Sequence, residues 1–260
     1  MISRPFLKHP AYYDLLAALL GILIILVGGA GCDSQGSGRP PIEEQPEGLG
    51  KGTTRLSDSL PSTSSTPASQ ATETLPTIVA FGDSLTAGLG VPADQTYPAQ
   101  LQQRLNALGY SYRVINAGVS GETTAGGLRR LEWILKYHPQ IVILELGAND
   151  GLRGLPIEEI YTNLEQIIQR LRAEGIIVIL AGMKLPPNYG QLYTTRFEAL
   201  YKKLAVHYTV TFIPFFLEGV AGNPQLNQAD GIHPTAQGYH IIVDHLMQVL
   251  EPLLRKSAHL

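Results

Sequence analysis

Residues 77–85 read Thr-Ile-Val-Ala-Phe-Gly-Asp-Ser-Leu, an apolar run followed at once by a glycine and two polar residues. A short, nearly continuous apolar run is typical of a strand that is buried on both faces. The pattern predicts a strand over 78–81 and places Ser84 just beyond its carboxyl end. Open α/β sheets bind their ligands outside the carboxyl ends of the strands. Ser84 is therefore a candidate nucleophile, provided that other segments supply a base, an orienting acid and oxyanion donors.

The rest of the chain alternates between apolar runs and segments of helical periodicity. We expect strands at 78–81, 112–116, 141–146, 176–180 and 210–213, and helices at 98–108, 124–137, 157–173, 192–207 and 236–254. Five strands that are each followed by a helix imply one parallel sheet covered on both faces. Right-handed crossovers then give an α/β fold with three layers, an α/β/α sandwich over residues 77–257. Trp133 lies in a helical stripe and is expected in the core.

Glycine-rich polar segments follow four of the five predicted strands. They are residues 82–85, 118–123, 147–150 and, later in its loop, 230–234. Because the carboxyl ends of parallel strands meet at one edge of a sheet, we expect the four segments to converge there. Their convergence favours a functional site over four separate surface turns.

The side chains in these segments can divide the work of acyl transfer. A serine hydroxyl is a weak nucleophile near neutral pH, and His233 can take its proton and later return it. Asp230 precedes His233 by three residues, so its carboxylate can orient the imidazole ring. The backbone N–H groups of Ser84 and Gly121 and the side-chain amide of Asn149 are suitable donors to an oxyanion.

These segments resemble the four blocks of the GDSL, or SGNH, hydrolases. The blocks correspond to residues 82–85, Gly121, residues 147–150 and residues 230–233, in the family's order. The extended runs at 80–90, 147–154 and 185–190 are similar to the bacterial thioesterase I/lysophospholipase/arylesterase branch. A single block is a weak signal, whereas four ordered blocks over residues 77–255 are a strong one.

The resemblance implies a function and a sheet order. Ser84 would be the nucleophile, His233 the base and Asp230 its orienting acid, with Ser84, Gly121 and Asn149 forming the oxyanion hole. The sheet would have five parallel strands in flavodoxin-like order, and no metal or organic cofactor is implied. The expected activity is that of a serine esterase, which hydrolyses acyl esters or thioesters through an acyl-enzyme and accepts small acyl ester or lysophospholipid-like substrates.

Two further hypotheses remain beside the esterase. The same catalytic residues would serve a deacetylase of cell-envelope carbohydrate. A non-enzymatic surface lipoprotein would not need Ser84, Asp230, His233 and Asn149 together. An α/β-hydrolase elbow, Gly-x-Ser-x-Gly, is excluded because Thr86 stands two residues after the serine.

Neighbouring residues in the same loops have expected roles as well. Asp83 and Asp150 are expected to stabilise their loops through hydrogen bonds to backbone groups. Leu152 and Tyr189 are candidates for the lining of an acyl pocket, although an apolar loop residue serves as often in packing alone.

The N-terminus has the pattern of a targeting segment. Arg4 and Lys8 precede an apolar stretch from Leu15 to Val27, which is followed by small residues and Cys32. The end of this stretch resembles the lipobox of bacterial lipoproteins, and that resemblance implies a signal peptide over 1–31 with lipid attachment at Cys32. An uncleaved anchor and a simply cleaved signal are the alternatives. In each case the folded body is expected outside the cytoplasm, in the periplasm or at the cell exterior. The lipid attachment and the uncleaved anchor would each hold it at the membrane.

Composition limits the remaining possibilities. Of the 44 residues from 33 to 76, 25 are Ser, Thr, Pro or Gly, so residues 32–76 are expected to form a disordered tether. With 19 Lys and Arg against 22 Asp and Glu, and no long basic run, the chain does not have the pattern of a nucleic-acid-binding protein. A single cysteine excludes an intrachain disulfide and a cysteine-based metal site. A monomer is the default expectation.

Overall fold

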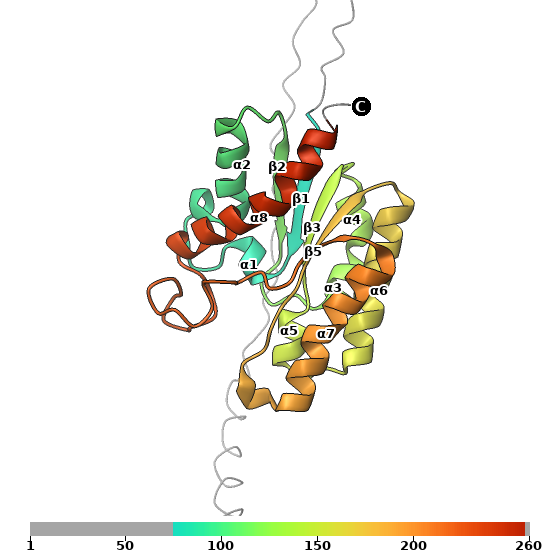
Figure 1. Ribbon diagram of the computed structural model, residues 1–260, viewed down its shortest axis with the longest axis vertical. Coiled ribbons are helices and arrows are strands. Elements are labelled where there is room, and N and C mark those ends of the chain that lie inside the picture. The colour runs from blue at the N-terminus through green and yellow to red at the C-terminus, as the bar shows by residue number, and fades with distance from the viewer. Residues whose placement is uncertain (1–74, 258–260) are drawn as a thin grey trace, which may run out of the picture. The chain divides into compact units, whose positions relative to one another are not determined.

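The computed structural model of the protein describes residues 75–257, which form a parallel sheet between two layers of helices (Figure 1). The strands are β1 (Thr77–Gly82), β2 (Arg113–Gly118), β3 (Ile141–Glu145), β4 (Ile177–Ala181) and β5 (Thr211–Ile213). The sheet order is β2-β1-β3-β4-β5, which is the flavodoxin-like order. The three-layer α/β/α fold expected from the sequence is therefore confirmed. The proposed signal peptide, the tether and Cys32 lie outside the described residues.

The helices are distributed over the two faces as right-handed crossovers require. They are α1 (Ser84–Ala87), α2 (Tyr97–Ala107), α3 (Thr124–Arg129), α4 (Leu131–Leu135), α5 (Ala148–Leu152), α6 (Ile157–Ala173), α7 (Gln191–Tyr208) and α8 (Ala236–Ser257), with 3-10 turns η1 (Ala93–Gln95) and η2 (Pro187–Tyr189). Helices α2 and α8 lie together on one side of the sheet, and α3, α6 and α7 lie on the other (Figure 1). The crossover from β1 to β2 runs along the sheet in the direction opposite to the later crossovers. Its helix, α2, therefore lies on the face opposite α3, α6 and α7, and α8 packs beside it on that face.

The centre of the sheet is the most deeply buried part of the fold. Every residue of β1 and β3 is buried, and the two strands pair in register from Ile78 opposite Ile141 to Gly82 opposite Glu145. A strand covered on both faces has apolar residues at nearly every position, which explains the apolar runs in both strands. The carboxyl ends of β1 and β3 therefore lie side by side, and so do the loops that follow them.

The predicted elements agree with the structure except in one helix. The segment 124–137 was expected to be a single helix, but it is divided into α3 and α4 at Arg130, where φ is −99° and ψ is 8°. Gly127 lies against the end of β3, since a Cβ atom there would come within 2.3 Å of Leu146 Cδ1. Glycine lowers helix propensity, and the side chain of Arg130 forms tertiary contacts in place of continuing the helical face.

The expected position of Trp133 is wrong. Its side chain is 46% exposed and packs edge-on against Tyr137, with ring centroids 4.9 Å apart. The core positions of α4 are instead Leu131 and Ile134. The division at Arg130 changes the direction of the helix, so a stripe extrapolated from residue 124 does not give the buried face of α4.

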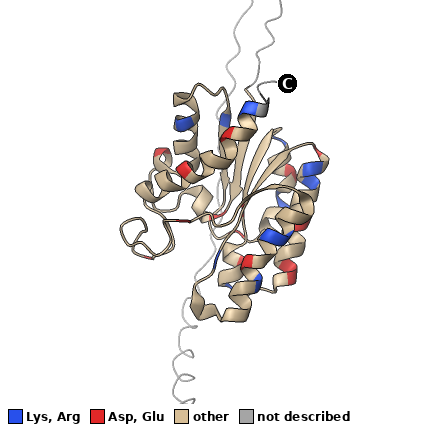
Figure 2. Ribbon diagram, viewed as in Figure 1, with Lys and Arg blue, Asp and Glu red and all other residues tan. Residues whose placement is uncertain are grey.

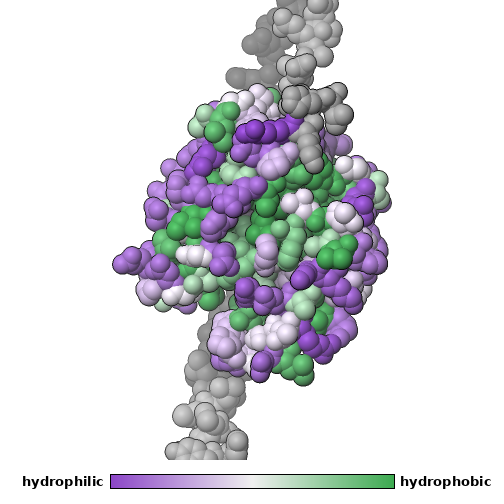
Figure 3. Space-filling model, viewed as in Figure 1, coloured by the Kyte–Doolittle hydropathy of each residue, from purple (hydrophilic) through white to green (hydrophobic). Residues whose placement is uncertain are grey.

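The surface shows charges of both signs. Lys and Arg are interspersed with Asp and Glu over the helices that Figure 2 displays. Apolar side chains come to the surface in patches between hydrophilic regions in the same orientation (Figure 3). Within residues 75–257, none of the helices combines the length and the apolarity needed to cross a bilayer.

Candidate active site

Ser84 is held at the junction between β1 and α1. Asp83 caps the short helix, because its Oδ1 accepts the backbone N–H of Leu85 at 3.0 Å. The helix ends at Gly88, whose φ of 79° is favourable for a residue without a side chain. This tight strand–helix turn places Ser84, 8% exposed, at the carboxyl edge of the sheet.

His233 and Asp230 come to Ser84 from the loop between β5 and α8. His233 Nε2 lies 2.9 Å from Ser84 Oγ, and His233 Nδ1 lies 2.7 Å from Asp230 Oδ2. The other carboxylate oxygen of Asp230 accepts the backbone N–H groups of Ile232 and His233, each at 3.0 Å. These hydrogen bonds, with that of the His233 backbone as the largest contribution, lower the pKa of Asp230 to about 2. The carboxylate is thus ionised at neutral pH and fixed toward the imidazole.

The three residues expected to form the oxyanion hole lie around one cavity. Ser84, Gly121 and Asn149 all line one cavity together with His233. Gly121 has φ of 78°, and its carbonyl accepts a hydrogen bond of 2.9 Å from Arg153. Within the described part of the chain, the backbone N–H groups of Ser84 and Gly121 have no hydrogen-bond partner, so both are available to a ligand.

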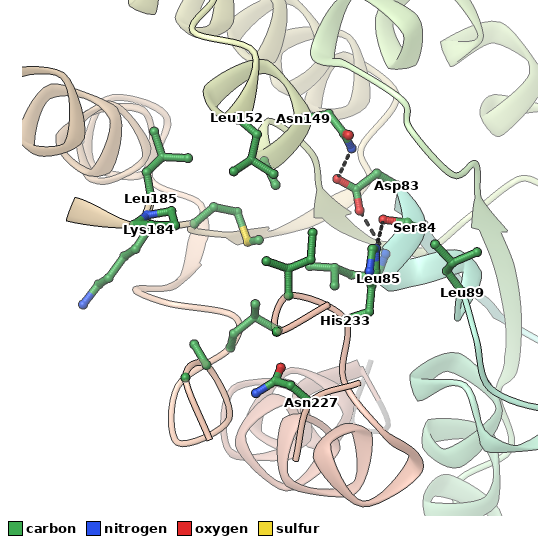
Figure 4. A pocket seen from close by; sticks show the side chains of 18 of the residues that line it. Asp83, Ser84, Leu85, Leu89, Asn149, Leu152, Lys184, Leu185, Asn227 and His233 are labelled. Carbon is green, nitrogen blue, oxygen red and sulfur yellow. Dashed lines mark hydrogen bonds between the residues drawn. The ribbon is translucent and has the colours of Figure 1, made fainter. Parts of the chain in front are cut away.

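The side chain of Asn149 is oriented by a hydrogen bond to Asp83. Its Nδ2 donates to Asp83 Oδ2 at 2.9 Å, which uses one of the two amide hydrogens (Figure 4). Asp150 is buried and accepts hydrogen bonds from Thr124, at 2.9 Å from the backbone N–H and 2.6 Å from the hydroxyl. Burial raises the pKa of Asp150. Asp83 and Asp150 therefore make the loop-stabilising hydrogen bonds expected from the sequence.

Glu145, at the end of β3, was not recognised from the sequence. It is fully buried, and its Oε2 accepts hydrogen bonds from the Asp83 backbone N–H at 3.3 Å and from the Thr86 hydroxyl at 2.8 Å. Burial raises the pKa of Glu145 well above its usual range. Burial of the Asp83 carboxyl likewise raises the pKa of Asp83 to about 6. A single carboxylate in an otherwise apolar strand was the signal that the pattern offered. Glu145 thus holds the turn between β1 and α1 through its hydrogen bonds to Asp83 and Thr86.

A cavity of about 600 Å³ opens beside Ser84. Its polar end is formed by the catalytic candidates, and its walls are mostly apolar; they include Leu89, Leu152, Met183, Leu185, Phe215, Leu217 and Ile232. Figure 4 shows Leu152 and Leu185 across the cavity from His233. Tyr189, the other expected lining residue, is not part of this lining, and its hydroxyl donates to the Leu152 carbonyl at 3.0 Å.

Comparison with known proteins places this geometry in a family. Residues 80–241 match the GDSL-like lipase/acylhydrolase family. The chain is 45% identical to esterase TesA of Pseudomonas aeruginosa over 179 residues, covering 68% of this chain and 89% of that protein. It is 40% identical to thioesterase 1/protease 1/lysophospholipase L1 of Escherichia coli strain K12 over 183 residues, covering 70% of this chain and 86% of that protein.

A solved structure supports the same assignment. The psychrotrophic esterase EstA from Pseudoalteromonas sp., in a structure inhibited by monoethylphosphonate, is 34% identical with a TM-score of 0.66. The match covers 69% of this chain and 98% of that chain. The match to the family spans most of the described fold and contains all four loops of the site. The chain therefore belongs to the GDSL-like lipase/acylhydrolase family and is a serine ester hydrolase of the SGNH type.

Proposed function

We propose that Ser84 attacks the carbonyl carbon of an acyl ester or thioester and forms an acyl-enzyme. The observation that carries the proposal is the continuous relay from Asp230 Oδ2 through His233 to Ser84 Oγ, with contacts of 2.7 and 2.9 Å. With Nδ1–H donating to the ionised Asp230, Nε2 is the atom that accepts the serine proton. The protonated imidazole then gives this proton to the departing alcohol or thiol.

The second half of the reaction uses the same groups in reverse. A water molecule takes the place of the leaving group, and His233 removes a proton from it as it attacks the acyl carbon. The imidazolium then returns this proton to Ser84 Oγ as the bond between Oγ and the acyl carbon breaks, and the acid product leaves. In both tetrahedral intermediates the negative oxygen would be bound by the N–H groups of Ser84 and Gly121 and by the amide of Asn149. One such donor contributes about 3–4 kcal/mol to transition-state stabilisation.

The shape of the cavity supports an apolar acyl group as the part of the substrate that is bound. Aliphatic side chains such as Leu152, Leu185 and Ile232 surround the space next to Ser84. Each buried methylene contributes about 0.8 kcal/mol to binding, so the affinity should increase with the length of the acyl chain. The E. coli relative is named for thioester and lysophospholipid hydrolysis, which fits such a site. An apolar wall offers little to an acetylated sugar, so the deacetylase alternative gains no support from the cavity.

A substrate panel with matched variants tests the proposal. Ser84→Ala should abolish hydrolysis of p-nitrophenyl esters, acyl thioesters and lysophospholipid, while thermal unfolding remains that of the wild type. Ser120→Ala is the control, because Ser120 also lines the cavity. Retention of activity in Ser84→Ala would refute the nucleophile assignment. Activity confined to acetylated glycans would refute the acyl ester assignment and favour the deacetylase.

We also propose that the enzyme acts outside the cytoplasm on a lipid anchor at Cys32. The support is the sequence alone, an apolar stretch that ends in small residues and the cysteine, before a segment rich in Ser, Thr, Pro and Gly. Labelled palmitate should enter the wild-type protein in cells and should not enter Cys32→Ala. Equal labelling of both proteins would refute lipid attachment at Cys32.

A further inference from the structure

Arg130, at the division between α3 and α4, connects two loops of the active site. Its Nε donates to Glu122 Oε2 at 2.7 Å, and its Nη2 donates both to the same carboxylate and, at 3.1 Å, to the carbonyl oxygen of Gly82. The Arg130 side chain is 17% exposed and that of Glu122 is 8% exposed. The ion pair is therefore largely shielded from water, and its geometry is held on more than one side.

The two partners of Arg130 belong to the segments that carry two oxyanion donors. Gly82 ends β1, two residues before Ser84, and Glu122 directly follows Gly121. The carbonyl of Gly82 also accepts the backbone N–H of Val119 at 3.0 Å, so the two segments already lie together at this point. The Arg130 guanidinium thus connects the turn that contains Gly82 and Ser84 to the loop that contains Gly121 and Glu122.

The guanidinium group is suited to fixing a separation. It is planar and rigid, and it presents its donors at fixed angles, unlike the single ammonium of lysine. One of its faces lies over the Phe81 ring, with 4.6 Å between Cζ and the ring centroid. The third donor has its own support, because Asn149 is held by Asp83. Arg130 therefore provides the side-chain tie between the other two donors.

We propose that Arg130, acting through Glu122 and the Gly82 carbonyl, is a positioning residue that sets the separation of the Ser84 and Gly121 N–H groups. The inference rests on the proposed function, in which those two groups bind the oxyanion. Donors aimed at the tetrahedral oxygen stabilise the transition state more than the ground state. Loss of the tie should therefore lower kcat and leave KM nearly unchanged.

A tetrahedral inhibitor provides a readout that a purely structural role would not change. Phenylboronic acid adds to a serine oxygen and places a negative oxygen where the oxyanion forms. We would measure kcat, KM and the boronate Ki for Arg130→Lys, Arg130→Gln and Glu122→Gln, at a temperature below each variant's thermal unfolding. Arg104→Lys and Arg104→Gln are the matched controls, because Arg104 pairs with Asp244 across α2 and α8 and contacts neither loop.

We expect both Arg130 variants to lose about 10- to 100-fold in kcat, in line with the cost of misplacing groups at a reacting centre. KM should stay within about twofold and the boronate Ki should rise in proportion to the loss of kcat. Glu122→Gln, which still accepts a hydrogen bond but lacks the charge, should show the same pattern more weakly. The Arg104 variants should match the wild type in all three quantities.

Two results would overturn the inference. Arg130 variants with lowered thermal stability but wild-type kcat and boronate Ki would show that the residue serves stability alone. A loss of kcat without any change in boronate Ki would show that it does not act through the oxyanion donors. If the Arg130 variants do not fold, Glu122→Gln decides by the same two criteria. Failure of the proposed function is separate, since active Ser84→Ala or a wild type insensitive to boronate would reveal it.

Discussion

Asn149 Nδ2 donates to Asp83 Oδ2 over 2.9 Å, although 66 residues separate the two side chains along the chain. This hydrogen bond fixes the rotation of the Asn149 amide, so that its second hydrogen is free for a ligand. Asp83, the neighbour of the proposed nucleophile, thus orients a side chain that projects from α5. The relationship leads to the first prediction.

Asp83→Ala should lower kcat by about 10- to 100-fold, less than the loss caused by removing an oxyanion donor outright. The variant should also lose about 1 kcal/mol of stability, because the cap of α1 is gone. Steady-state kinetics and thermal unfolding measure the two effects separately. Thr96→Ala is the control, since it removes the cap of α2 away from the relay. Equal kcat in both variants would mean that Asp83 is only a helix cap.

The second prediction concerns the pH dependence of stability. The pKa of Asp83 is raised from 3.8 to about 6, chiefly by burial. Between these values the folded state holds a proton that the unfolded state has lost, so rising pH favours unfolding. The free energy of unfolding of the wild type, minus that of Asp83→Asn, should therefore fall from pH 3.8 to about 6 and then level off.

Urea denaturation at a series of pH values measures this difference. Asp230→Asn is the control with the opposite sign. The pKa of Asp230 is lowered to about 2, so its contribution is complete above 3.8, decreases as pH falls toward 2, and is nearly flat over the Asp83 window. A difference for Asp83→Asn that rose with pH would contradict the assignment of a buried carboxyl with a raised pKa.

The third prediction separates the two residues expected to line the acyl pocket. Leu152→Ala should reduce kcat/KM more for long acyl esters than for short ones, because it removes apolar wall from the cavity. Tyr189→Phe keeps the ring and loses only the hydrogen bond to the Leu152 carbonyl, so the acyl-length profile should keep its shape. Hydrolysis of p-nitrophenyl esters from acetate to palmitate gives both profiles. An altered profile in Tyr189→Phe alone would reverse the two roles.

The fourth prediction follows from the exposure of Trp133. Trp133→Ala should cost about 1 kcal/mol of stability, the contribution of an aromatic pair with Tyr137 at the surface. Ile134→Ala, the next residue along and fully buried, should cost about 2–5 kcal/mol. Denaturant unfolding of the two variants provides the comparison. A larger loss for Trp133→Ala would restore the core position expected from the sequence.

The sequence was most informative where a local pattern decides the structure. The helix 157–173 was predicted at its observed bounds, because Pro156 precedes a regular stripe that includes Ile160 and Leu164, and Gly175 follows its end. The continuous apolar runs also predicted the five strands to within about two residues. These features depend on neighbouring residues and require no knowledge of the tertiary fold.

The parts that were missed depend on contacts between distant segments. Arg130 interrupts a helix because of partners in β1 and in the loop after β2. Glu145 is buried next to the turn between β1 and α1, and Tyr189 donates a hydrogen bond to the Leu152 carbonyl at the end of α5 and does not line the cavity. No spacing along the chain indicates such contacts. The sequence predicted which residues meet at the site, whereas the structure was needed to show what holds them in place.

The relay between Ser84 and His233 also has a consequence for biosynthesis, since 149 residues separate the two side chains. The ribosome makes Ser84, the proposed nucleophile, early and His233, its proposed base, late, after the five strands of the sheet. A nascent chain therefore carries a serine without the base that activates it. In the proposed mechanism, hydrolysis requires the segment between β5 and α8 to be translated and docked, so an incomplete nascent chain should not hydrolyse esters.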